Sequence, residues 1–175
     1  MLSNIVKIKA ILCDIDGVLT DGGLIFDNEG NELKKFNAKD GQIVKYLIED
    51  GFKLGAITGR KSQVVKNRCN ELKFHFHKHG ISNKLEEYEN FKKEFNLKDE
   101  EIAYIGDDII DLGIISRCGL SFTTNDARDY IKNEVDIIVK SNGGEGAYRD
   151  MCDYILENQN KLSDIIQKNL RSWNE

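Results

Sequence analysis

Three aspartates lie close together near the beginning of the sequence, in the stretch CDIDGVLTDG at residues 13–22. Asp14, Asp16 and Asp21 directly follow the apolar residues 10–13. Neighbouring carboxylates repel one another, so stability seldom explains a cluster of this kind. We therefore treat it as a candidate for chemistry and search the rest of the chain for groups that could act with it.

The accompanying polar residues indicate phosphoryl transfer. Asp14 and Asp16 follow the first apolar run, Thr58 ends KLGAIT, Asp107 follows IAYIG, and Lys84 begins a helical pattern between them. The Asp14 carboxylate could attack phosphorus and form an aspartyl-phosphate, and Asp16 could protonate the leaving oxygen and then activate water. Thr58 and Lys84 would bind the phosphoryl oxygens. Asp14, Asp107 and the Asp16 carbonyl predict a Mg²⁺ site, since this ion prefers hard oxygen ligands.

Alternating strand and helix patterns predict the elements that bring these groups together. A parallel sheet with helices on both faces is expected, a Rossmann-like three-layer α/β/α fold whose functional groups gather at the carboxyl ends of the strands. A hairpin is expected at 24–36, and a single domain at 1–158 with a weakly amphipathic tail at 159–175. Strands are predicted at 8–13, 53–58, 74–77, 102–106, 120–124 and 135–139, and helices at 40–50, 61–72, 83–95, 108–117, 126–133 and 145–158.

Composition narrows the classes of partner. The 175 residues carry a net charge of -5, which argues against nucleic acid, because phosphate-backbone binding needs a basic face. No apolar run approaches the roughly 20 residues that span a bilayer, and no signal peptide is evident, so no membrane partner and a cytoplasmic location are expected. The four cysteines form no CxxC pair, which is typical of reduced thiols.

Four ordered motifs resemble those of the haloacid dehalogenase superfamily of phosphohydrolases. They are DxDGVxTDG from residue 14, TGR at 58–60, the lone Lys84, and GDDxxD at 106–111. KKFNAKDG at 34–41 and NGGEGAYRDMCDYIL at 142–156 extend the likeness to the family of 3-deoxy-D-manno-octulosonate 8-phosphate (KDO 8-phosphate) phosphatases. That family hydrolyses a small sugar-acid phosphate during lipopolysaccharide sugar synthesis.

The resemblance implies a capless domain that needs Mg²⁺ and forms a homotetramer through the hairpin after the first strand. Leu24, Ile25, Phe26, Leu33 and Phe36 would form the apolar ribbon of that hairpin. It also implies that substrate is contacted by Asp16, Asn37, Ala38, Lys39, Asp40, Gly41, Lys45, Arg60, Arg68 and Lys84. Lys39 departs from the pattern, because an arginine is expected before Asp40 and lysine lacks its bidentate fork.

Arg60 and Arg68 are candidates for the substrate carboxylate. They lie eight residues apart, and on one helix that spacing would return both to roughly the same face. A guanidinium suits a carboxylate, since its fork matches the two oxygens. The arginine after TG favours the eight-carbon sugar, whereas an acidic residue there would favour a nine-carbon, sialic-acid-like nonulosonate 9-phosphate.

Two other patterns have competing interpretations. His75, His77 and His79 alternate, so strand geometry would put all three on one face, where zinc binding is feasible but lacks a fourth ligand. His79 is the more natural candidate for the pocket mouth. Residues 143–146 (GGEG) could be a phosphate cradle but lack the Lys-Ser/Thr of a P-loop, which favours a hinge or the entry to a helix.

Two alternative functions fit these residues less well than a phosphatase. A phospho-receiver signalling domain also combines acids, threonine and lysine on a parallel sheet, but it carries its acceptor aspartate on a middle strand, where this chain has Thr58. A catalytically idle oligomerisation module would not need every catalytic residue type. The sequence therefore favours a Mg²⁺-dependent phosphoric monoester hydrolase.

Overall fold

A six-stranded parallel sheet forms the centre of the computed structural model, which describes residues 5–171. The strand order is β5-β4-β1-β6-β7-β8, so the first strand of the chain lies between two strands formed much later. In register, Ala10 of β1 lies opposite both Lys53 of β4 and Ile102 of β6. The strands are β1 (Ala10–Cys13), β4 (Lys53–Thr58), β5 (Phe76–His79), β6 (Ile102–Ile105), β7 (Leu120–Thr123) and β8 (Ile137–Ile138).

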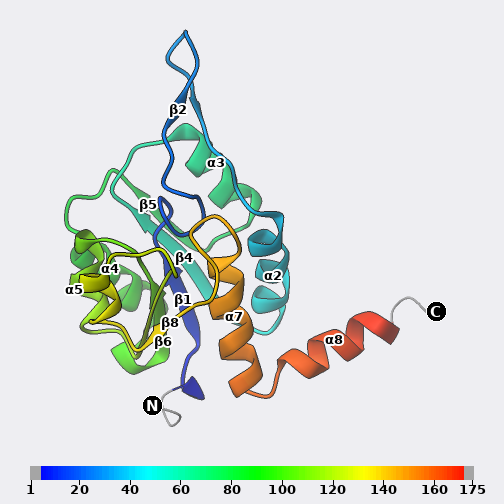
Figure 1. Cartoon of the computed structure of the whole chain (residues 1–175). Helices are drawn as coiled ribbons and strands as arrows, with labels where there is room; N and C mark the ends of the chain where they lie inside the picture. Colours follow the sequence, from blue (N-terminus) through cyan, green and yellow to red (C-terminus); the bar gives the residue numbers. More distant parts are fainter. Residues whose placement is uncertain (1–4, 172–175) are drawn as a thin grey trace.

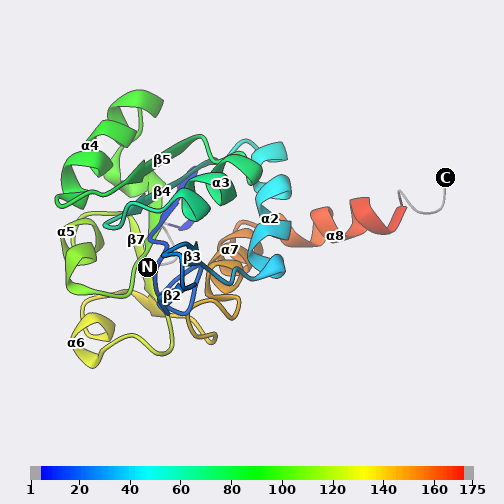
Figure 2. The same ribbon diagram turned by 90° about the horizontal axis from the view of Figure 1, so that it is seen from above.

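Helices cover both faces of the sheet, as predicted (Figures 1 and 2). One apolar core joins a face of the sheet to α2 (Ala38–Glu49), α3 (Gln63–Glu71) and α7 (Ala147–Asn158). A second core joins the other face to α4 (Lys84–Phe95), α5 (Leu112–Ile115) and α6 (Asp129–Lys132). The predicted α/β/α architecture is therefore confirmed.

Two element boundaries differ from the prediction in ways that affect the site. Ser62 accepts a hydrogen bond from the Val65 N–H at 3.3 Å and caps α3, so the helix begins at Gln63 and Arg60 lies outside it. The prediction that Arg60 and Arg68 share one helix is therefore wrong. The predicted helix at 108–117 is instead a 3₁₀ turn at Ile109–Asp111 followed by the short α5.

The predicted hairpin is present but has only two residues in each strand. Strands β2 (Ile25–Phe26) and β3 (Glu32–Leu33) pair antiparallel, and the Asp27 carboxylate accepts hydrogen bonds from the Glu29 and Asn31 N–H groups at 2.8 Å. The hairpin projects from the body beyond the sheet (Figure 1). Four of the five predicted ribbon residues are 51–55% exposed: Leu24, Ile25, Phe26 and Leu33.

Phe36 does not belong to that exposed ribbon. It is half-buried against the core, and the Arg68 guanidinium carbon lies 5.7 Å from its ring centroid. The hairpin therefore exposes apolar side chains along its two strands, while its base is packed on the domain.

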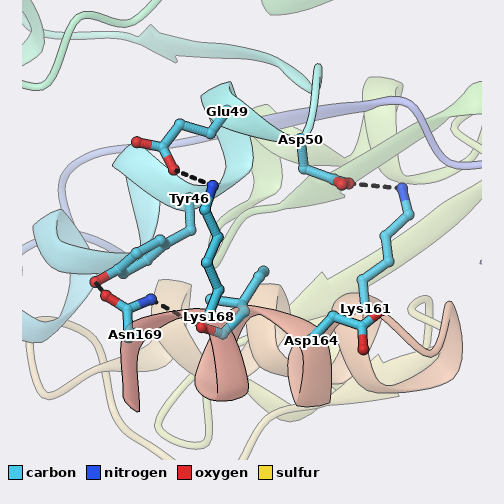
Figure 3. Close-up of a pocket in the computed structure, with 8 residues that line it drawn as sticks. Tyr46, Glu49, Asp50, Lys161, Asp164, Lys168 and Asn169 are labelled. Carbon is cyan, nitrogen blue, oxygen red and sulfur yellow. Dashed lines mark hydrogen bonds and ion pairs between the residues drawn. The ribbon is translucent and has the colours of Figure 1, made fainter. Parts of the chain in front are cut away.

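The predicted tail contains a further helix, α8 (Leu162–Arg171), that extends away from the sheet (Figure 1). Figure 3 shows polar contacts between the C-terminal end of α2 and the tail: Lys161 Nζ lies 2.7 Å from Asp50 Oδ2, and Tyr46 Oη donates to Asn169 Oδ1 at 3.0 Å. Leu162 and Ile165 pack against the core beneath them. The division of the chain into 1–158 and 159–175 stays a prediction. Among residues 5–171, no helix has the length and apolar character needed to cross a bilayer.

Candidate active site

A buried ammonium between two carboxylates forms the centre of the site. Asp14 follows β1, and its N–H donates to the Ile105 carbonyl of β6 at 2.9 Å, which fixes its position at the rim of the sheet. Lys84 Nζ lies 2.8 Å from Asp14 Oδ1 and 2.6 Å from Asp111 Oδ1, and the three side chains are at most 8% exposed. Burial lowers the pKa of Lys84, but the charges of Asp14 and Asp111 outweigh burial and raise this pKa above its ordinary value.

Asp111 organises this centre, although the sequence reasoning gave it no role there. Its Oδ2 accepts the N–H groups of Asp107 and Asp108 at 3.1 Å each, and its Oδ1 accepts the Tyr104 hydroxyl at 2.5 Å. Gly106 allows the close approach, since a Cβ there would lie 2.4 Å from Asp111 Cγ. The spacing GDDxxD was the signal that could have assigned Asp111 this role.

The site carries more negative charge than its one lysine balances. Oxygens of Asp14, Asp107 and Asp111 lie within 4.8 Å of one another, and Lys84 is the cation that contacts two of them. Burial is the main cause that raises the pKa of Asp14 to about 7 and that of Asp107 to about 8, and neighbouring carboxylates raise both further. Within residues 5–171, the buried Oδ1 of Asp107 accepts no hydrogen bond. This donor set fits a divalent cation with oxygen ligands.

Thr58 is connected to the Lys84 segment through the backbone. Thr58 is buried at the end of β4, and its carbonyl accepts the Ile81 N–H at 3.1 Å. The Arg60 carbonyl accepts the Gly80 N–H, also at 3.1 Å. These bonds hold the two predicted phosphate-binding residues, Thr58 and Lys84, on adjoining loops of one rim.

Asp16 is held by the base of the hairpin. Lys34 Nζ contacts Asp16 Oδ1 and lies 3.5 Å from Glu32 Oε1, and its side chain is completely buried. Glu32 also pairs with the exposed Arg60 at 3.4 Å. Lys34 is a contact that sequence reasoning missed, because nothing in the charge pattern distinguishes it from the neighbouring Lys35.

The predicted substrate residues on α2 lie in different environments. Asn37 caps the helix by accepting the Lys39 N–H at 2.9 Å, and its amide donates to the Gly144 carbonyl at 3.4 Å. Ala38 and Lys39 are exposed at the first turn, and the exposed Lys45 lies 3.8 Å from Glu49. These side chains are accessible to a ligand.

Asp40 is the exception among these residues. It is 3% exposed, and its Oδ1 accepts the Arg149 N–H of α7 at 2.8 Å. Burial raises the pKa of Asp40 to about 6. Its side chain therefore joins α2 to α7, and its role in substrate binding stays a prediction.

The two arginines contact different segments. Arg60 pairs with Glu32 of the hairpin, whereas Arg68 Nη1 lies 2.9 Å from Glu71 and its guanidinium covers the start of α2. Gly41 makes room for Arg68, since a Cβ there would lie 2.5 Å from Arg68 Nη2. The structure thus brings Arg68 to the 37–41 segment and Arg60 to the Lys34–Asp16 pair.

The GGEG segment packs against the aspartate loop. A Cβ on Gly143 would lie 2.0 Å from the Gly17 carbonyl oxygen, and the Gly144 N–H donates to the Val18 carbonyl at 2.9 Å. The segment then leads into α7, which agrees with the predicted helix entry. Gly17 itself has a φ of +93°, and a Cβ there would meet Asp107 Oδ2 at 2.0 Å. Both close approaches therefore require glycine.

The three histidines do not form one cluster. His75 Nδ1 accepts the Leu54 N–H at 3.1 Å, so this ring is engaged with β4. His77 Nδ1 and His79 Nε2 lie 2.8 Å apart, and burial lowers the pKa of both. His75 also lies against Phe95 of α4, whereas His77 contacts Asn70 of α3 on the other face of the sheet. The prediction that all three histidines lie on one face is therefore wrong, and only His77 and His79 are paired.

Comparison with known proteins assigns the chain to a family. Residues 76–151 match the family model of haloacid dehalogenase-like hydrolases. The 3-deoxy-D-manno-octulosonate 8-phosphate phosphatase KdsC of Haemophilus influenzae is 37% identical over 174 residues, which cover 98% of this chain and 97% of that protein.

Solved structures agree with this assignment. The phosphatase of that name from Moraxella catarrhalis, in complex with a magnesium ion, a phosphate ion and a KDO molecule, superposes with a TM-score of 0.92 at 32% identity, over 95% of this chain and 96% of that one. The cobalt-bound Haemophilus influenzae phosphatase superposes with a TM-score of 0.87 at 37% identity, over 90% of this chain and 92% of that one. With near-complete coverage at this identity, the chain belongs to the family of 3-deoxy-D-manno-octulosonate 8-phosphate phosphatases within the haloacid dehalogenase-like hydrolases.

Proposed function

We propose that this protein hydrolyses KDO 8-phosphate to KDO and inorganic phosphate, with Mg²⁺ as cofactor and in the cytoplasm. The observation that carries the proposal is the buried Asp14–Lys84–Asp111 group at the rim of a chain that matches this phosphatase family almost end to end. Asp107 beside this group supplies the second carboxylate for the cation. The four free cysteines fit a reducing compartment.

The residues act in two steps. The Asp14 carboxylate attacks phosphorus, the bond from phosphorus to the sugar oxygen breaks, and Asp16 gives its proton to that oxygen. Asp16 then takes a proton from water, whose oxygen attacks the phosphorus of the aspartyl-phosphate and restores Asp14. Thr58 and Lys84 bind the phosphoryl oxygens, while Asp111 holds Lys84 in place. Mg²⁺, held by Asp14, Asp107 and the Asp16 carbonyl, supplies the positive charge that lets a phosphate dianion enter among carboxylates.

Lys34 connects Asp16 to the base of the hairpin. The buried Lys34 ammonium contacts the Asp16 carboxylate and so restrains the position of the residue that acts as acid and then as base. Lys34 also contacts Glu32 of β3, so the hairpin base and Asp16 are held by one side chain.

We further propose a homotetramer built through the hairpin. Four apolar side chains along its strands are about half exposed, and an apolar patch of this kind marks an interface. Neighbouring subunits would then close the sites that lack a cap. Lys39, Lys45, Arg60 and Arg68 are the cations available to bind the sugar carboxylate, within one subunit or across such an interface.

Replacing Asp14 with Asn tests the nucleophile. We expect kcat for KDO 8-phosphate to fall by a factor on the order of 10⁴ or more, because an amide cannot form the acyl phosphate. The thermal midpoint should change little, since Asp111 still pairs with Lys84 and the repulsion among the three carboxylates decreases. Asp21→Asn is the matched control, because Asp21 is an exposed residue of the same loop and should keep its activity. Substantial turnover by Asp14→Asn would contradict the mechanism.

Removal of divalent ions tests the cation site. Excess chelator should abolish turnover, and added Mg²⁺ should restore it and raise the thermal midpoint, because the ion relieves repulsion between Asp14 and Asp107. In Asp107→Asn, the Mg²⁺-dependent rise in the midpoint should be lost or much smaller. An equal rise in both proteins would place the ion elsewhere.

Replacing Arg60 or Arg68 with Ala tests the identity of the substrate. Each change should lower kcat/KM for KDO 8-phosphate tenfold to about a hundredfold, as expected for a lost charged hydrogen bond of about 1.5–3 kcal/mol. Turnover of p-nitrophenyl phosphate, which has no carboxylate, should stay near normal, and Arg128→Ala on the far face should change neither. Equal losses on both substrates would refute the carboxylate role. Faster turnover of a nonulosonate 9-phosphate by the wild type would select the nine-carbon sugar instead.

A charged substitution on the hairpin tests the proposed homotetramer. Sedimentation velocity at micromolar concentration should show a tetramer for the wild type and smaller species for Phe26→Asp, because a charge would be buried at the interface. Tyr130→Asp on α6, at a side chain that is also 50% exposed, should remain tetrameric. A wild-type monomer would rule out this assembly.

A further inference from the structure

A second group of metal-binding side chains lies on the edge strand β5 and the helix that packs on it. Cys69 of α3, His77 and His79 each offer one ligand atom, and these atoms lie within 4.8 Å of one another. β5 is the edge of the sheet, whereas Asp14 follows the central strand, so this group is separate from the aspartates of the active site.

Strand geometry explains why the three residues meet. His77 and His79 are two positions apart on β5, so their side chains point to the same face of the sheet. α3 packs on that face and contributes the buried Cys69 one turn from its C-terminal end. The ligands therefore come from two regular elements, and such elements hold a site more firmly than loops do.

Asn70 orients one of the imidazoles. Its side-chain oxygen lies 3.0 Å from His77 Nε2, and with that oxygen as acceptor, His77 carries its proton on Nε2. The lone pair on Nδ1 then faces His79, whose Nε2 lies 2.8 Å away. A second hydrogen bond from the far nitrogen of a ligand histidine is the usual arrangement around protein-bound metals.

A cavity beside the imidazoles leaves space for a further ligand. It has a volume of about 520 Å³ and is lined by Lys61, Ser62, Gln63, Lys66, His77 and His79. His79 Nδ1 is buried and makes no hydrogen bond to any residue in the described part of the chain. Two lysines at the rim oppose a cation, so the thiolate of Cys69 is needed to supply compensating negative charge.

We propose that Cys69, His77 and His79 bind a divalent d-block ion of the zinc class, with water from the cavity as fourth ligand. One thiolate and two imidazoles with water is an established tetrahedral set for Zn²⁺ and does not suit Mg²⁺. Binding would release the Cys69 proton, because the thiolate is the metal ligand.

The ion would act on the segment that leads to Lys84. His79 is paired in register with Thr58, and Gly80 and Ile81 donate to the carbonyls of Arg60 and Thr58. An ion fixed to His79 therefore restrains the path between β5 and the catalytic ammonium. It is a structural site that does not touch the substrate.

The proposal can be tested by titrating the metal-stripped full chain with Co²⁺. The titration is carried out on the Asp107→Asn variant with excess Mg²⁺ present. We expect one Co²⁺ per chain with the intense visible absorption of a tetrahedral site and thiolate-to-cobalt charge transfer, displaced by Zn²⁺. The charge-transfer band should disappear in Cys69→Ser, and the tetrahedral spectrum should be lost in His79→Ala. Asn70→Ala should weaken the affinity roughly tenfold to a hundredfold.

Matched controls separate this site from adventitious binding. Cys118→Ser and His75→Ala should keep the spectrum, since Cys118 lies in the other core and His75 is engaged with Leu54. If Cys69→Ser fails to fold, His79→Ala decides, because that ring is only partly buried. Absence of the charge-transfer band in the parent, or its survival in His79→Ala and Cys69→Ser, would overturn the proposal.

Discussion

The ion pairs of Lys84 with Asp14 and Asp111 are the interaction on which the site depends. A buried ammonium is tolerated only when carboxylates compensate it, and removing one partner of such a pair leaves an uncompensated buried charge. Asp111 meets this need while also accepting two backbone N–H groups from the Asp107 loop. The positions of Lys84 and of the Asp107 loop are thus set by the side chain of Asp111, to which the proposed mechanism gives no contact with the substrate.

Much of this arrangement could be predicted from the sequence. The ends of strands can be predicted because apolar runs stop at polar residues. The prediction that Asp14, Thr58 and Asp107 lie on one rim of the sheet was therefore correct. The roles of the site residues beyond this placement stay predictions. Contacts between segments that only the tertiary structure brings together could not be predicted from the sequence. Lys34 has the sequence context of a solvent-exposed lysine, but in the folded chain it contacts Asp16.

At Arg60 the observed structure differs from the helical periodicity. Ser62 caps α3, so the helix starts at Gln63, three residues after Arg60, and Arg60 lies outside the helix that was predicted to contain it. Asp40 has the sequence context of a binding residue, yet it is buried against the Arg149 N–H. A sequence pattern gives the spacing of residues along the chain. A helix cap or a buried hydrogen bond also depends on which groups the fold places next to a residue.

The packing of Gly143 and Gly144 against residues 17–21 has a consequence for the order of assembly. Asp14 follows the first strand, yet the neighbours of that strand in the sheet begin at Lys53 and Ile102, and the Asp14 loop is completed only by glycines near residue 143. Contacts of such long sequence separation form late in folding and during synthesis. A growing chain therefore cannot hydrolyse phosphate esters until about four-fifths of it has been made, so catalytic competence arrives together with the finished domain.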